Sequence, residues 1–294
     1  MRRALLLLFV AALAVVAAGC GGSSNKSSAG GTTSTSATSC AKADLNLVNA
    51  GQLTVGTDNP AYPPWFAGTP KAPWKVGYPP SGQGFEGAVA DAVAQKLGFA
   101  KDEVKWIVVP FNTSYAPGPK KFDFDINEVS FTPARAKVVD FSNSYYDVQQ
   151  AIVGKNGTKI ANAKSVADLK PYKLGAQIGT TSYQFIQSTI KPSKQTSVFD
   201  TNDAAVAALK NGQIEGLVVD LPTAFYVTSA QVPNSKIIGQ FESTTGEHFG
   251  MVFEKGNSLV KCVNGALAKL ESDGTLKQVQ DKWLAKVGGA PVLK

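Results

Sequence analysis

Segments with the apolar period of strands alternate with segments that have the period of helices along most of the chain, and this alternation restricts the fold more than any other feature. Apolar residues recur every four positions at Phe85, Val89, Val93 and Leu97. This spacing predicts one face of a helix, which Gly98 would end. Short apolar segments predict buried strands at 53–57, 104–109, 123–129, 150–153, 173–177 and 214–219, with further helices at 202–209 and 259–270. Such alternation indicates an α/β fold with largely parallel sheets.

Residues 1–19 have the composition of a secretory signal peptide. Arg2 and Arg3 precede an uninterrupted apolar stretch that is shorter than the roughly 20 residues of a membrane-spanning helix. Small residues directly precede Cys20, and this pattern is similar to the bacterial lipobox, in which the cysteine is acylated. The alternative is an ordinary cleaved signal peptide with an incidental cysteine. Gly, Ser, Thr and Ala fill 21–39 almost completely, so we expect a flexible tether that extends through residue 40.

The charge of the chain argues against nucleic-acid binding. The net charge of +7 includes two arginines that leave with the signal peptide, so the mature chain carries +5. The lysines are dispersed, without basic runs or interleaved aromatics. We therefore expect no nucleic-acid partner and only mild attraction to anionic envelope surfaces.

The two remaining cysteines could form a disulfide, and with the single histidine they are the residues to consider as metal ligands. Cys40 and Cys262 are an even pair far apart in an exported chain, which makes a disulfide plausible; two buried free thiols are the alternative. The chain has no CxxC pair, and His248 is its only histidine. We expect no metal site and no cofactor.

Several motifs, taken in order, resemble the extracellular solute-binding proteins of polar amino-acid ABC importers, a family-3 type with a periplasmic-binding-protein-like fold. The resemblance extends from about residue 45 to residue 287. Its motifs are 53–58 with 62–65, 84–86, 131–135 with 138–142 and 145–146, 175–181, 217–220, 273–274 and 282–283.

This resemblance implies a two-lobed type II fold, in which two hinge crossings join two α/β lobes. We expect lobe one to be discontinuous, from 41–151 and 249–294, and lobe two to be 152–248. It also implies a monomer that binds a polar amino acid between its lobes and delivers it to a membrane permease of an ABC importer. The protein would act outside the cytoplasm, anchored to the membrane by the lipid on Cys20.

The resemblance also assigns residues that would bind the backbone of an amino acid. Arg135, just after a helix start predicted at Thr132, would clamp the carboxylate through its planar guanidinium. Thr180 and Thr181 would hold the same carboxylate, Asp220 would accept from the ammonium group, and Ser130 would add a hydrogen bond. Without the family, each residue has a more ordinary role. Arg135 would be a solvated charge, Thr180 and Thr181 would belong to a turn with its cap, and Asp220 would be a helix cap.

The resemblance also implies three aromatic residues around the ligand and two further acids at the pocket. Tyr62, Trp65 and Phe111 match positions where the family stacks aromatics, although at least one of them can simply pack the lobe. Asp58 and Glu128 are the acids, and many relatives have Gly or Ser in place of Glu128.

The charges of these residues suggest a cationic ligand. Asp58, Glu128 and Asp220 against Arg135 give a nominal charge of −2, which a cationic side chain relieves, since uncompensated buried charge is costly. This argument fails if Glu128 faces solvent or pairs with Lys120 or Lys121.

Two other classes of function are alternatives. Some proteins of this fold are enzymes, such as dehydratases or cell-wall lyases, and Glu128 would then be a general base. The sequence shows no Ser-His-Asp order and no paired acid with a suitable partner, so we expect a protein without enzymatic activity. A ligand-sensing module of a receptor would need a downstream membrane-spanning and signalling segment, which we do not expect.

Overall fold

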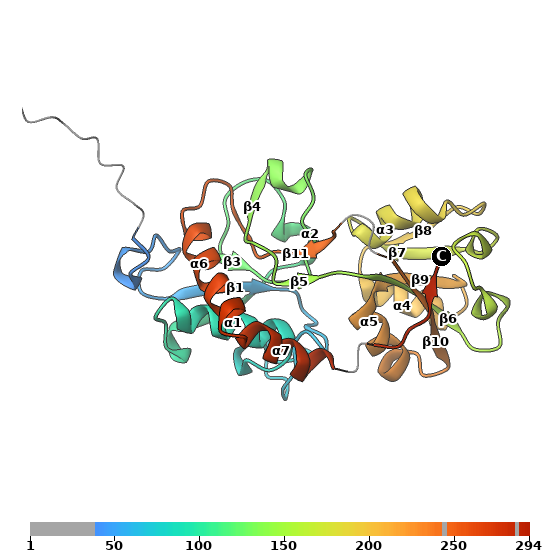
Figure 1. The fold of residues 1–294 in the computed structure, drawn as a ribbon, viewed down its shortest axis with the longest axis horizontal. Helices are drawn as coiled ribbons and strands as arrows, with labels where there is room; N and C mark the ends of the chain where they lie inside the picture. Colours follow the sequence, from blue (N-terminus) through green and yellow to red (C-terminus); the bar gives the residue numbers. More distant parts are fainter. Residues whose placement is uncertain (1–38, 243–245, 286–287) are drawn as a thin grey trace, which may run out of the picture. The chain divides into compact units, whose positions relative to one another are not determined.

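A computed structural model describes residues 39–242, 246–285 and 288–294 (Figure 1). The predicted signal peptide, the lipidation residue Cys20 and most of the tether lie outside these described residues. One compact unit runs from residue 38 to residue 294. Its strands form two large mixed sheets and one two-stranded sheet, with helices packed around the large ones, so the predicted α/β fold class is confirmed.

The first sheet organises the lobe that begins the described chain. Its strand order is β2 (Val104–Val108), β1 (Leu53–Thr57), β3 (Phe124–Asp125), β12 (Val252–Glu254) and β4 (Val139–Phe141). β1 is parallel to both of its neighbours, and all five of its residues are buried, as expected for a central parallel strand. Around it, one core cluster joins α1 (Phe85–Lys96), α6 (Leu259–Ser272) and α7 (Thr275–Leu284). The short helix α2 (Phe111–Ser114) also lies in this first lobe.

The second sheet organises the other lobe. Its strand order is β13 (Val292–Leu293), β10 (Ser235–Phe241), β6 (Gln150–Lys155), β9 (Gly216–Asp220), β7 (Leu174–Gln177) and β8 (Ser197–Phe199). Ile152 of β6 packs into one core cluster and its neighbours Ala151 and Val153 into another, because successive side chains of a strand point to opposite faces. The helices of this second lobe are α3 (Thr181–Phe185), α4 (Asn202–Lys210) and α5 (Leu221–Tyr226).

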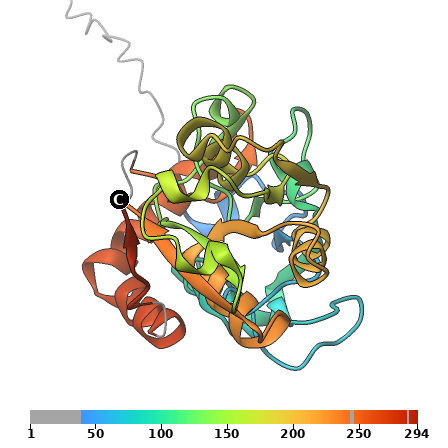
Figure 2. The same cartoon turned by 90° about the vertical axis from the view of Figure 1, so that its right-hand side faces the viewer.

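Two antiparallel strands lie where the chain passes between the lobes. β5 (Tyr146–Asp147) pairs with β11 (His248–Phe249), and both lie between the two sheets in Figure 1. The chain leaves the first lobe after β5 and returns at β11, close to the predicted crossings. It passes to the second lobe once more after α7, because β13 pairs in parallel with β10 (Figure 2). The prediction that all of 249–294 belongs to lobe one is therefore wrong for its last strand.

Other predicted elements differ in length from those in the structure. The strand predicted over 123–129 is only two residues long, Phe124–Asp125, and the predicted range also contains Glu128, whose φ of +53° no β-strand uses. The helix predicted to start at Thr132 is a three-residue 3₁₀ helix, Arg135–Lys137, because β4 begins at Val139.

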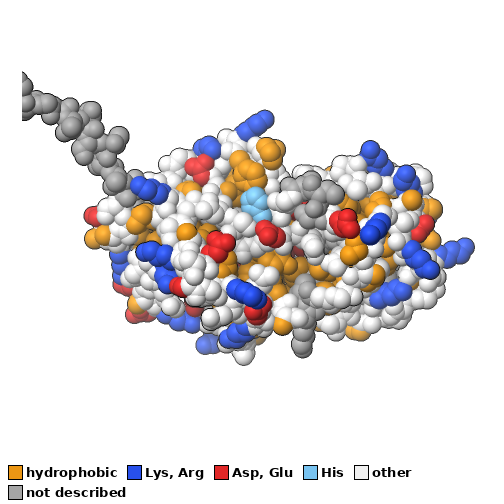
Figure 3. Space-filling view, viewed as in Figure 1, with side chains coloured by type: hydrophobic (Ala, Val, Ile, Leu, Met, Phe, Trp, Pro, Cys, Tyr) orange, Lys and Arg blue, Asp and Glu red, His pale blue; other side chains and the backbone are white. Residues whose placement is uncertain are grey.

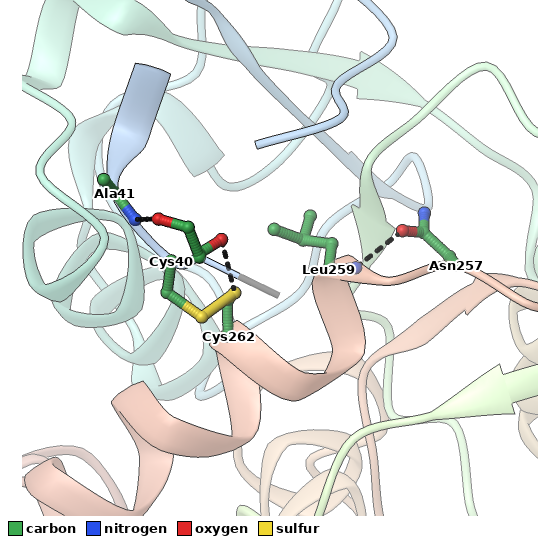
Figure 4. Close-up of a disulfide and its surroundings, with 6 residues drawn as sticks. Cys40, Ala41, Asn257, Leu259 and Cys262 are labelled. Carbon is green, nitrogen blue, oxygen red and sulfur yellow. Dashed lines mark hydrogen bonds between the residues drawn. A yellow bond between two sulfur atoms is a disulfide. The ribbon is translucent and has the colours of Figure 1, made fainter. Parts of the chain in front are cut away.

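A disulfide joins Cys40 to Cys262 of α6 (Figure 4). The two cysteines are 222 residues apart in sequence, and Cys262 is buried in the core of the first lobe. The start of the folded chain is therefore fastened to a helix that forms near its end.

Candidate functional site

A cavity of about 160 Å³ lies between the two lobes. All ten residues predicted to bind the ligand line it, while their contacts with a ligand stay a prediction. These residues are Asp58, Tyr62, Trp65, Phe111, Glu128, Ser130, Arg135, Thr180, Thr181 and Asp220.

Arg135 lies in the cavity wall with its guanidinium almost out of water. Its Nη1 donates to the carbonyl of Ser130 at 2.5 Å, and its Nη2 donates to the carbonyl of Gly179 in the other lobe at 2.8 Å. The ring of Tyr115 faces the guanidinium at 4.2 Å, and burial lowers the pKa of Arg135 from its usual value. A guanidinium has five N–H donors, so N–H groups remain for a carboxylate.

The hydroxyl groups around Arg135 come from both lobes. Ser130 Oγ donates to Glu247 Oε1 at 2.7 Å and lies 3.2 Å from Thr181 Oγ1. The Thr180 hydroxyl caps α3 by accepting from the N–H of Tyr183, and it donates to the carbonyl of Gln177. Thr180 thus has a structural role in the helix cap as well as a place in the cavity wall.

Asp220 ends β9 and belongs to a polar network at the crossing strands. Gln150 Nε2 donates to Asp220 Oδ1 at 2.6 Å, and Gln150 Oε1 accepts from the Ser182 hydroxyl at 2.7 Å. Burial raises the pKa of Asp220 well above its usual range; Glu247 raises it further, and Arg135 acts against this. The carboxylate therefore gains stability when a cation approaches it.

Glu128 faces the cavity and not the surrounding water. Its Oε2 accepts from the Thr223 hydroxyl of α5 at 2.9 Å, and Thr223 Oγ1 accepts from Trp65 Nε1 at 2.9 Å. Lys120 donates instead to the carbonyls of Thr113 and Ala116. Burial raises the pKa of Glu128 well above its usual range, and the nearby carboxyls of Glu86 and Asp220 add to the rise.

Glu86 supports Glu128 from behind the cavity. It is wholly buried, and its Oε1 accepts from the backbone N–H of Glu128 at 2.7 Å and from the Tyr145 hydroxyl at 2.5 Å. Burial raises the pKa of Glu86 to about 7, although both hydrogen bonds lower it. The carboxyl therefore holds a proton for part of the time near neutral pH. It also supports the left-handed backbone of Glu128.

The aromatic residues divide into core and cavity surfaces. Trp65 is 1 % exposed and packs edge-on against Phe85, Tyr146 and Phe249, so its ring belongs mostly to the core and its N–H faces Thr223. Phe111 lies 5.6 Å from the Arg135 guanidinium.

Tyr62 reaches across the cavity. Its hydroxyl donates to Asp203 Oδ1 of α4 at 2.8 Å, and its ring lies 5.5 Å from that of Tyr226. Asp58 directly follows β1, and burial raises its pKa, with the charge of Asp203 adding to the rise.

The sequence did not indicate several residues of this site. Asn127, Gln177, Ser182, Asp203, Thr223, Tyr226 and Gln231 also line the cavity. Of these, Asn127 carries a buried Nδ2, and among the described residues this atom has no hydrogen-bond partner. Asp203 and Thr223 lie in the first turn of a helix, where an acid or a threonine is ordinary, so no local signal separates them from surface residues.

His248 lies outside this cavity. It lines a second hollow beside the crossing strands, and its ring stacks on Phe131 with centroids 5.3 Å apart. On the face shown in Figure 3, acidic side chains lie near the histidine, and the basic side chains are scattered. Across the described ranges no group of three metal-binding side chains is close enough to hold an ion. In the same part of the chain, no helix has the length and apolarity needed to cross a membrane.

The two large mixed sheets, the crossing strands and the cavity between the lobes define a two-lobed, type II binding-protein fold. The family model of the bacterial extracellular solute-binding proteins, family 3, matches residues 53–286. The chain belongs to this family.

Curated relatives and a solved structure agree with this assignment. ABC transporter arginine-binding protein 1 of Escherichia coli (strain K12) is 31 % identical over 56 % of this chain and 67 % of its own length. The glutamine-binding protein GlnH of an ABC transporter of Bacillus subtilis (strain 168) is 31 % identical over 70 % and 75 %. The structure of an ancestral arginine-binding protein bound to arginine is 33 % identical, with a TM-score of 0.63 over 79 % and 98 %. The family is described as extracellular, and both curated relatives are named as binding proteins of ABC transporters.

Proposed function

We propose that this protein captures an amino acid with a positively charged side chain and delivers it to an ABC importer. The observation that supports this ligand most strongly is the charge of the cavity wall. Its carboxyl groups are those of Asp58, Glu128, Asp203 and Asp220, against the single guanidinium of Arg135. The nominal charge of −3 among these described residues is one unit more negative than the sequence indicated.

The surroundings of the carboxyl groups strengthen this argument. Burial raises the pKa values of Asp58, Glu128 and Asp220, so removal from water opposes their ionised forms. A zwitterion brings no net charge, whereas a guanidinium or ammonium on the ligand side chain compensates one of these carboxylates. The charge argument requires that no lysine pairs with Glu128, and the Glu128 carboxylate contacts Thr223 and not a lysine.

Arg135 and Asp220 provide for the two charges that every free amino acid carries. Arg135 would bind the α-carboxylate with the N–H groups left free by its two carbonyl contacts, with help from Ser130 and Thr181. Asp220 would accept from the α-ammonium group. Contacts from both lobes would then stabilise the arrangement in which the lobes meet, so that binding shifts the population toward it.

The names of the relatives are compatible with this proposal, and they include both cationic and neutral ligands. One curated relative is named for arginine and another for glutamine, and both belong to ABC transporters. The charged cavity wall is what favours a cation for this chain. An enzymatic function with Glu128 as general base has less support, because both curated relatives are named as binding proteins of ABC transporters.

A thermal-shift experiment with the common amino acids tests this function. Arginine or lysine at about 1,000 times Kd should stabilise the protein by about 4 kcal/mol, which raises Tm by roughly 10 °C. The shift should be larger at pH 8 than at pH 5, because protons occupy the carboxyls of raised pKa at low pH and oppose the cation. The recovered ligand should be chemically unchanged.

A shift with neutral or acidic amino acids alone would contradict the cationic ligand and leave the family function intact. No shift with any amino acid would contradict the proposed ligand class. A ligand recovered in altered form would favour the enzyme.

We also propose that a lipid on Cys20 holds the protein at the membrane surface, with 21–39 as the tether. The apolar stretch that ends in small residues before Cys20 supports this. In a bacterial host that processes lipoproteins, the wild-type chain should appear in the membrane fraction, with Cys20 as the lipid-bearing N-terminal residue by mass spectrometry. The Cys20→Ala protein should appear in the extracytoplasmic soluble fraction. Wild-type protein without lipid would rule out the anchor.

A further inference from the structure

Tyr62, Asp203 and Tyr226 form a polar and aromatic part of the cavity wall that the binding of an α-amino acid backbone does not explain. Tyr62 belongs to the first lobe, and the other two belong to α4 and α5 of the second lobe. The Tyr62 hydroxyl donates to Asp203 Oδ1 at 2.8 Å, and the rings of Tyr62 and Tyr226 lie 5.5 Å apart. All three side chains line the cavity.

Asp203 is not needed as a cap for its own helix. Thr201 is the N-cap of α4, and its Oγ1 accepts from the backbone N–H of Ala204 at 3.2 Å. The Asp203 carboxylate turns instead toward Tyr62, and its Oδ2 has no partner in the described part of the chain.

The surroundings of Asp203 suit a cation. Asp58 lies close enough on the first lobe for the two negative charges to repel each other. The faces of Tyr62 and Tyr226 attract a guanidinium or ammonium group that lies near them. A positive group at this place would face carboxylates from both lobes and aromatic rings from both lobes.

We propose that Asp203 is a specificity-determining residue whose carboxylate accepts hydrogen bonds from the terminal cationic group of a long ligand side chain. This inference rests on the proposed cationic ligand and extends it, since it places the side-chain end of the ligand between Asp58 and Asp203. The Tyr62 hydroxyl keeps the carboxylate in position.

The test compares arginine with citrulline, which has the same length but a neutral end group, by calorimetry on the full-length protein. Wild type should prefer arginine. Asp203→Asn should lose about 10- to 100-fold in arginine affinity, the effect of a lost charge-assisted contact, and should bind citrulline within about threefold of wild type. Asp203→Glu keeps the negative charge and should therefore retain the preference for arginine over citrulline. This second variant keeps the test decisive if Asp203→Asn folds poorly.

Two controls separate recognition of charge from contact between the lobes. Tyr62→Phe removes the hydrogen bond that positions the carboxylate and keeps its charge, so it should lower arginine affinity less than Asp203→Asn does and should preserve the preference for arginine over citrulline. Asp200→Asn makes the same chemical change at an exposed aspartate just before α4, outside the cavity wall, and should leave both affinities unchanged.

Equal loss for both ligands in Asp203→Asn would overturn the proposal and leave Asp203 as a contact between lobes. Unchanged arginine affinity would overturn it as well. Failure of the proposed function is visible before any variant is made, because wild type would then bind citrulline as tightly as arginine.

Discussion

The Asp220→Asn variant is expected to bind its amino acid about 100-fold or more weakly than wild type. Removing one partner of a buried, hydrogen-bonded charge pair costs about 2–5 kcal/mol, much of it from leaving the other charge unpaired. Here that other charge is the ammonium of the ligand. The asparagine keeps the shape of the side chain, and its Oδ1 still accepts from Gln150 Nε2, which lies 2.6 Å away in wild type. Calorimetric titration measures the change in affinity.

Asp102→Asn is the matched control, because it makes the same change at an exposed residue outside the cavity wall. It should bind like wild type. Wild-type affinity in the Asp220→Asn variant, with its fold intact by circular dichroism, would show that Asp220 does not hold the ammonium group.

The Cys40–Cys262 bond should have the largest effect on stability. A cross-link between residues 222 positions apart removes much of the chain entropy of the unfolded state, which corresponds to about 5 kcal/mol. The double variant Cys40→Ala and Cys262→Ala should therefore lose about 3–5 kcal/mol of unfolding free energy, measured by denaturant titration.

Reduced wild type serves as a control without any change of sequence. If the bond itself is responsible, reduced wild type and the double variant should unfold at similar denaturant concentrations. A loss below about 1 kcal/mol in both would mean that the packing of α6 alone fastens the start of the chain.

The sequence predicted those elements whose signal is local. The four-residue period from Phe85 to Leu97 predicted α1, and the apolar segments predicted β1 and the start of α6. Elements shaped by distant contacts were predicted less well. Glu128 has a left-handed backbone after β3, and its N–H donates to Glu86, a residue more than forty positions earlier that no local pattern connects with it.

The same distinction applies to the site. Arg135 and Asp220 could be assigned because they stand in motifs of the family. Asp203 could not, since its significance depends on the hydroxyl of Tyr62, which lies 141 positions away in the sequence and in the other lobe. Thr223 likewise becomes a site residue only where Trp65 and Glu128 meet it across the cavity.

The pairing of β13 with β10 has a practical consequence for measuring motion in this protein. Residue 40 is bonded to α6 in the first lobe, whereas residue 293 is paired with Phe241 in the second. Fluorophores attached next to these two positions would sit on different lobes and outside the cavity wall. Energy transfer between them would therefore report the separation of the lobes directly, with every cavity residue left in its native form.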